Sequence, residues 1–211
     1  MKTRSIAAAA ALVLLGSCSA PYSGVTIFQI CAFPAPDATT GDCLYEATCA
    51  NSLVGPSFLD VTGAGYDFVL PIQFNNQLTS SANTSNGTVN ANDAYVESVY
   101  ITYSGANVNP VTVPVSLTVP AAGSITGVIP LIPSSYFASL PVSATSLTEV
   151  VLTVKASGKF LSQETFTTQT FQIPVLICAG CSATAANVCP SGKTLTGVCP
   201  QLGQTATVNC Q

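Results

Sequence analysis

Hydrophobic and polar residues alternate with a period of two through the middle of the chain. Such alternation predicts half-buried antiparallel strands. Proline cannot donate a hydrogen bond to a sheet ladder, so Pro114 and Pro120 predict that the second of the two clearest runs lies at a sheet edge or is irregular. The apolar positions of these two runs are Tyr66, Phe68, Leu70, Ile72 and Phe74, then Val111, Val113, Val115, Leu117 and Val119.

Other segments predict further strands, and together they indicate the fold class. Ser157-Gly158 predicts a tight turn between two of them, and residues 134–140 predict one short helical turn that a serine caps and Pro141 ends. About seven or eight strands without a long helix favour an all-β fold, an antiparallel immunoglobulin-like β-sandwich. The further strands are expected at 25–30, 99–103, 125–132, 150–155, 160–165 and 168–177.

The same pattern divides the chain into regions. We expect the β-sandwich over 25–177, with a cysteine-containing N-terminal segment at 25–57, followed by a cysteine-rich C-terminal segment at 178–211. Residues 79–94 are polar and rich in asparagine, which fits either a solvated connection or a recognition loop on a rigid scaffold. Two glycosylation sequons, at Asn83 and Asn86, would matter only in a eukaryotic secreted glycoprotein.

The first residues have the layout of an export signal. Lys2 and Arg4 precede an apolar run of about ten residues, which is too short to span a bilayer. The run ends in Leu15-Gly16-Ser17-Cys18, which resembles the lipobox of bacterial lipoproteins. The resemblance implies that residues 1–17 are a signal peptide cut before Cys18, and that Cys18 carries the lipid (diacylglycerol and a further acyl chain such as palmitate).

The resemblance also implies a location. Residues 18–24 would be a short tether that holds the body close to a membrane, and two or three acyl chains anchor durably. In that family an aspartate after the modified cysteine commonly retains the protein at the inner membrane, so Ser19 favours the outer membrane of the cell envelope. The alternative is an ordinary signal peptide cut after Ala20.

The composition argues against several classes of function. The processed chain would keep three lysines (Lys155, Lys159 and Lys193) against nine acidic residues, and without a basic patch we expect no nucleic-acid partner. Histidine is absent, which removes Ser-His-Asp, Cys-His and HExxH chemistry along with the commonest metal ligand. We therefore expect no enzyme, no catalytic residue, no cofactor and no metal.

Nine cysteines leave one unpaired in an exported chain, and lipidation of Cys18 accounts for it. The remaining eight fall into groups of three and five. Because both numbers are odd, full pairing requires at least one bridge between the groups, so that the two ends of the chain meet at one pole. The disulfide candidates are Cys31, Cys43 and Cys49, then Cys178, Cys181, Cys189, Cys199 and Cys210.

Cys178-Ala-Gly-Cys181 leaves three interpretations. It fits structural disulfides best in an exported protein, but its spacing also occurs in thiol-disulfide redox sites and in zinc sites. No tryptophan flanks it and no histidine exists to complete a zinc site.

Few other residues indicate chemistry. Asn90, Asn92 and Asp93 offer oxygens for calcium, but a closing glutamate and a glycine turn are missing. Asp60, Asp67, Asp93 and Glu97 could include a carboxylate pair for glycoside hydrolysis or be surface charges. Tyr95, Tyr100 and Tyr103 lie on or beside one strand, and Tyr100 is expected to be exposed as a contact point for a protein or glycan ligand.

The sequence thus predicts a membrane-anchored bacterial envelope lipoprotein with a structural or binding role. The alternatives are an envelope thiol-disulfide oxidoreductase or hydrolase, and a eukaryotic secreted glycoprotein. The ligand, the disulfide connectivity, the membrane leaflet and the oligomeric state are not encoded in any recognisable pattern.

Overall fold

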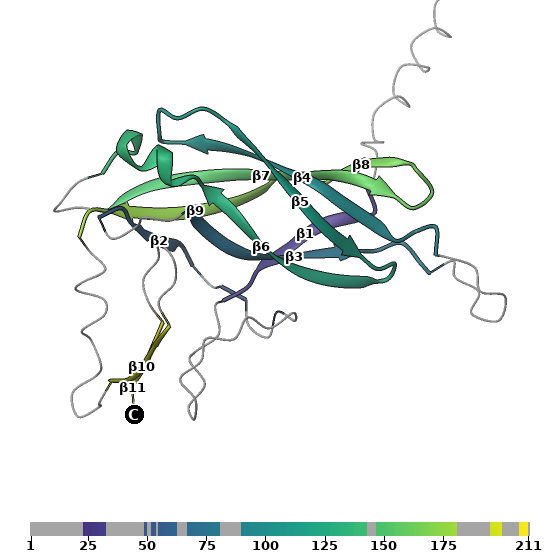
Figure 1. Cartoon of the computed structure of the whole chain (residues 1–211), viewed down its shortest axis with the longest axis horizontal. Coiled ribbons are helices and arrows are strands. Elements are labelled where there is room, and N and C mark those ends of the chain that lie inside the picture. Colours follow the sequence, from purple (N-terminus) through teal and green to yellow (C-terminus); the bar gives the residue numbers. More distant parts are fainter. Residues whose placement is uncertain are drawn as a thin grey trace, which may run out of the picture.

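The computed structural model of the chain is all-β (Figure 1). It describes residues 23–32, 49, 52–53, 55–62, 67–80, 90–142 and 147–180, and the backbone of 195–199 and 207–210. The elements of this part are β1 (Val25–Ile30), β2 (Ser57–Asp60), β3 (Phe68–Asn76), β4 (Ala94–Ser104), β5 (Val111–Val119), β6 (Gly123–Ile132), the 3-10 helix η1 (Ser134–Ser139), β7 (Thr148–Phe160), β8 (Thr165–Thr167), β9 (Phe171–Cys178), β10 (Leu195–Cys199) and β11 (Thr207–Cys210).

Strands β1 to β9 form two sheets. The three-stranded sheet has the order β1-β3-β6, and the six-stranded sheet has the order β2-β9-β7-β4-β5 with β8 beside β7. Neighbours pair antiparallel, except that β2 runs parallel to β9. Strands β10 and β11 form a separate antiparallel pair.

One hydrophobic core fills the space between the two sheets. Alternate residues of β3 are buried, and Val99, Ile101 and Leu152 meet them from the six-stranded sheet. Fully burying each such side chain contributes about 1.5–3 kcal/mol. The alternation expected from the sequence is therefore confirmed for β3, where the buried positions are Phe68, Leu70, Ile72 and Phe74; Tyr66 lies outside the described residues.

Several expected strands are confirmed. The bounds of β1 and β5 are those that the sequence predicted, and β5 lies at an edge of its sheet as its prolines required. The apolar positions of β5 from Val111 to Leu117 are only half-buried, because an edge strand has a neighbour on one side only. The two sheets hold nine strands, against about seven or eight expected.

The turn expected at Ser157-Gly158 is wrong, because both residues lie inside the single long strand β7. A Cβ on Gly158 would lie 2.0 Å from the carbonyl oxygen of Tyr95, so the glycine permits close approach of β4 and not a reversal of the chain. The reversal comes at residues 161–164, where the amide of Phe160 donates to the carbonyl of Glu164 at 2.9 Å. The expected strand at 160–165 is therefore the end of β7 and this turn.

The helical turn expected at 134–140 is present, but its capping differs. The residue before η1 is Pro133, and no side chain of that residue caps the helix. The carboxylate of Asp67 accepts the amide of Ser134 at 2.8 Å instead. The helix ends at Ser139, and Leu140 is its C-cap residue, directly before Pro141.

Candidate functional site

The expected anchor joins the fold at the start of β1. Cys18 lies outside the described residues, but the first described turn is well fixed, since the amide of Gln77 donates to the carbonyl of Gly24 at 2.8 Å. Gly24 has φ +67°, and a Cβ there would lie 2.8 Å from Cγ of Leu78. Gly24 is the sixth residue after Cys18, which limits the tether to roughly 20 Å.

Within the described residues, the three strands of the smaller sheet, β1, β3 and β6, carry no charged side chain. We name the outer surface of this sheet the uncharged face and define it by Phe28, Gln29, Gln73, Ser124 and Val128. Phe28 is 58% exposed and Val128 is 45% exposed.

Two glutamine side chains link the strands of the uncharged face. The Gln29 amide donates to the side-chain oxygen of Gln73 at 2.8 Å, and the Gln73 amide donates to the Ser124 hydroxyl at 3.3 Å. A register shift between Ile27 and Gln29 marks a bulge in β1. Because of this bulge, Phe28 and Gln29 both avoid the core although they are consecutive.

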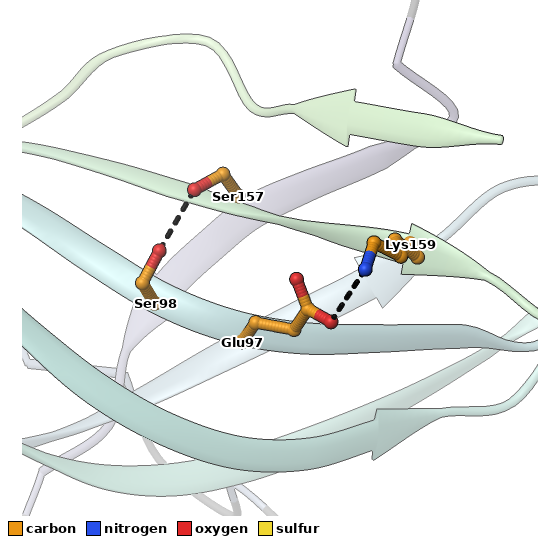
Figure 2. Close-up of polar contacts among 4 residues, drawn as sticks. All are labelled: Glu97, Ser98, Ser157 and Lys159. Atoms are coloured by element: carbon orange, nitrogen blue, oxygen red, sulfur yellow. Dashed lines mark hydrogen bonds and ion pairs between the residues drawn. The ribbon is translucent and has the colours of Figure 1, made fainter. Parts of the chain in front are cut away.

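The outer surface of the six-stranded sheet is charged. We name it the charged face and define it by Tyr95, Glu97, Tyr100, Lys155 and Lys159. Figure 2 shows Glu97 pointing toward Lys159 from the neighbouring strand, with 3.4 Å between the Glu97 carboxylate and the Lys159 amine. Both side chains are nearly half exposed, so the ion pair contributes little stability.

A second bulge shapes the charged face. The register of β4 shifts between Val96 and Ser98 against both neighbours. Residues five apart on a regular strand point to opposite faces, but this extra residue brings Tyr95 and Tyr100 to the same face, 38% and 44% exposed. The exposure expected for Tyr100 is confirmed. The hydroxyls of Ser98 and Ser157 lie 2.9 Å apart beside the bulge (Figure 2).

Tyr103 turns inward, unlike the other two tyrosines of β4. Its hydroxyl donates to the carbonyl of Leu131 at 2.8 Å, and its ring meets that of Tyr136 edge-on, with 5.9 Å between centroids. Burial raises the pKa of Tyr103 well above its usual value, and the nearby Tyr136 raises it further. Tyr103 is therefore a packing residue of the fold.

Asp60 organises the end of β9 where the C-terminal cysteines begin. It pairs in register with Cys178 and is 3% exposed. One of its carboxylate oxygens accepts the amide of Gly180 at 2.8 Å, and the amide and hydroxyl of Thr62 at 3.0 and 2.7 Å. These bonds hold the turn after Cys178. No local pattern predicts the bond to Gly180, because Gly180 lies 120 residues from Asp60 in the chain.

The cysteines are described in part. Cys31 and Cys49 form a disulfide with 5.3 Å between their Cα atoms, and Cys178 is also disulfide-bonded. Cys43, Cys181 and Cys189 lie outside the described residues, and Cys199 and Cys210 are placed by backbone only, on β10 and β11.

The ends of the asparagine-rich loop use their side chains to close it. The Asn92 amide donates to the carbonyl of Thr79 at 2.7 Å, the Asn90 amide donates to the Ser80 hydroxyl at 3.1 Å, and a carboxylate oxygen of Asp93 accepts the amide of Ala121 at 2.8 Å. The three residues weighed for calcium thus have protein partners. Residues 81–89, with both sequons, lie outside the described part.

The described part contains no cluster of three or more side chains among cysteine, aspartate and glutamate that could hold a metal ion. Within the same residues, no helix is long and apolar enough to cross a membrane. No protein-family model, curated protein or solved structure matches the chain.

Proposed function

We propose that the protein is a lipid-anchored lipoprotein of the bacterial cell envelope, with a structural or binding role and no catalytic one. The observation that carries this proposal is Leu15-Gly16-Ser17-Cys18 at the end of a charged and then apolar N-terminal run. The start of β1 supports it, because Gly24, six residues beyond Cys18, is hydrogen-bonded to Gln77 and gives an anchored body a fixed attachment point.

The finer fold that we propose is an immunoglobulin-like sandwich. The order β1-β3-β6 corresponds to strands A, B and E of that fold, and β4, β7 and β9 correspond to C, F and G of the opposite sheet. The fold departs from antibody domains, since β3 and β7 contain no cysteine to join the sheets. The one disulfide whose two cysteines are both described instead joins Cys31 and Cys49 at the end of β1.

The charged face supports a binding role. It presents Tyr95 and Tyr100 among hydroxyl groups, and it holds two of the three lysines that the processed chain would keep. Tyrosine combines a large apolar ring with a polar tip and is common at contact surfaces. The partner that we favour is a protein or glycan of the envelope.

The experiment that tests the anchor is the intact mass of the protein from a bacterial host, compared with that of the Cys18→Ala variant. The expected mass of the native protein is that of residues 18–211 with two or three acyl chains. The Cys18→Ala variant should be soluble or remain an unprocessed precursor, while a Ser19→Ala variant should behave as the native protein. A Cys18→Ala variant that is processed and still membrane-bound would refute the proposal.

The expected location is the outer membrane, because Ser19 replaces the aspartate that retains many lipoproteins at the inner membrane. Membrane fractionation should recover the native protein with outer-membrane markers. Recovery wholly with the inner membrane would contradict the location without affecting the anchor.

A further inference from the structure

We propose that the uncharged face is the surface that lies against the lipid bilayer. Phe28 and Val128 would then reach the boundary between headgroups and acyl chains. This inference rests on the proposed lipid anchor at Cys18, and it adds which side of the molecule meets the membrane.

The position of the tether brings this face near the bilayer. The chain enters the fold at Gly24, which hydrogen bonds fix to the end of β3, and Phe28 follows four residues later on the outermost strand of the three-stranded sheet. A tether limited to roughly 20 Å keeps β1 within reach of the headgroups. Figure 1 shows β1 (purple) beside β3, and these two strands belong to the sheet that does not contain β7 and β8.

The distribution of charge decides which face turns toward the lipid. All charged residues within the two described sheets lie in the six-stranded sheet, at Asp60, Glu97, Glu149, Lys155 and Lys159. Pressing the solvent-exposed ones, such as Glu97, Lys155 and Lys159, against a bilayer would remove the water that hydrates them, which is unfavourable. None of the three strands of the uncharged face carries such a group.

Apolar side chains supply the attraction. A single exposed phenylalanine carries little information, but Phe28 is more than half exposed and Val128 projects from the same sheet. Apolar residues of this kind favour insertion about 5–10 Å into the boundary between headgroups and acyl chains. The bulge of β1 turns Phe28 outward, so the local backbone geometry presents the ring to this side.

The orientation has a consequence for the proposed binding role. With the uncharged face on the bilayer, Tyr95 and Tyr100 point away from the membrane on the opposite sheet. The charged face then remains open to a partner in the surrounding compartment.

Fluorescence can test the inference directly, because the chain contains no tryptophan. The variants Phe28→Trp and Val128→Trp place one probe each on the uncharged face, and Tyr100→Trp is the matched control on the charged face. Each acylated full-length variant is reconstituted into vesicles of phosphatidylethanolamine and phosphatidylglycerol, with or without phosphatidylcholine brominated on its acyl chains. Intact mass first confirms that each preparation carries the acyl chains.

The brominated lipid should quench at least about half of the fluorescence in the Phe28→Trp and Val128→Trp variants, and less than about a tenth in Tyr100→Trp. If the mass shows the acyl chains but neither probe on the uncharged face is quenched, the orientation is refuted and the anchor stands. Quenching of Tyr100→Trp alone, or of a Leu161→Trp probe in the turn after β7 alone, would also refute it. A Phe28→Trp probe shielded from both brominated lipid and aqueous acrylamide would show that protein covers the face. Absence of the acyl chains would overturn both proposals.

Discussion

At the scale of single residues, Gly158 has the tightest steric requirement among the described glycines. It lies opposite the bulge of β4, where the backbone of Tyr95 and Val96 occupies the space of a side chain: a Cβ would lie 2.0 Å from a carbonyl oxygen. Backbone cannot move aside as a flexible side chain does. Gly158 therefore sets the distance between β4 and β7. This distance in turn sets the position of Tyr95 on the charged face.

Gly158→Ala should destabilise the protein by about 1–3 kcal/mol, since the methyl group forces the two central strands apart. Ser157→Ala is the matched control: it removes only the hydrogen bond to Ser98, and should cost about 0.5–1.5 kcal/mol or less. Urea denaturation with the disulfides intact measures both. Equal stabilities of Gly158→Ala and the native protein would show that β4 does not approach as described.

Tyr103 should make the fold sensitive to alkali. Its pKa is raised in the folded state, so the folded protein keeps the proton that the unfolded chain releases. The contribution of Tyr103 to the free energy of unfolding is therefore fully present below the unfolded pKa of about 10, and it is lost as the pH rises above this value. Thermal unfolding as a function of pH should show this loss, and Tyr103→Phe should reduce its slope.

Tyr100→Phe serves as the control for this measurement, because it removes an exposed hydroxyl from the same strand. It should retain the alkaline slope of the native protein. A Tyr103→Phe variant with an unchanged slope would mean that another group causes the loss.

At the scale of elements, Asn76 joins the ends of three strands. It is fully buried at the end of β3, and its side-chain amide donates to the carbonyls of Asn92 at 2.7 Å and Val119 at 3.3 Å. Its side-chain oxygen accepts the amide of Leu78 at 3.1 Å. One side chain thus connects the three-stranded sheet to the ends of β4 and β5 in the other sheet.

Asn76→Ala should cost about 2–4 kcal/mol, because it leaves several buried backbone groups without partners. Asn75→Ala, one residue earlier and facing outward, should cost well under half as much. Chemical denaturation compares them, and hydrogen exchange at Leu78 should increase in the Asn76→Ala variant only. Similar costs for the two variants would contradict the connecting role of Asn76.

The sequence predicts the strands in which buried residues recur with a period of two. It does not predict the elements whose structure depends on contacts with residues far away in the chain. The alternation that marks β3 and β5 arises because a strand buries every second residue, so their faces could be predicted. Ser157-Gly158 was misinterpreted because a turn and a bulge partner both favour glycine, and the choice depends on β4, some sixty residues away. Strand β2 is four residues long and forms by pairing with β9, a partner that no local pattern reveals.

At the scale of the whole molecule, the two sheets differ in surface chemistry. One has strands without charged residues and begins at Gly24, and the other presents tyrosines with lysine and glutamate. The sequence predicted Tyr100 as exposed from its neighbours Val99 and Ile101. The joint exposure of Tyr95 could not be foreseen, since it depends on the extra residue at the bulge of β4. The uncharged face likewise emerges only when β1, β3 and β6, which are distant in sequence, become neighbours.

The disulfide between Cys31 and Cys49 reduces the number of pairings that remain possible for the other cysteines. Cys31 pairs with Cys49, which leaves Cys43 as the remaining cysteine of the N-terminal group. In the β10–β11 hairpin, Cys199 lies opposite Thr207 and Cys210 lies opposite Leu195. These cysteines are about 10 Å or more apart along the strands, beyond the roughly 7 Å that a disulfide allows between Cα atoms, so they do not bridge each other.

If Cys18 carries the lipid and the other eight cysteines all pair, Cys43 must be bonded to a cysteine between residues 178 and 210. Such a bridge closes a loop of about 135 residues or more and stabilises the fold by roughly 4–5 kcal/mol in the chain-entropy model. Asp60 pairs with Cys178 across β2 and β9, so the chain between Cys49 and β3 passes close to the first of the C-terminal cysteines. Peptide mapping of the unreduced protein should recover a fragment that joins Cys43 to this group.

Thiol titration under denaturing, non-reducing conditions provides the matched comparison. Cys43→Ser should release one titratable thiol from the C-terminal group, whereas the double variant Cys31→Ser/Cys49→Ser should release none, because it removes both partners of one bridge. A native protein in which Cys43 titrates as a free thiol would contradict the prediction. So would a Cys43→Ser variant that gains no thiol, since the C-terminal cysteines would then pair without help from the N-terminal segment.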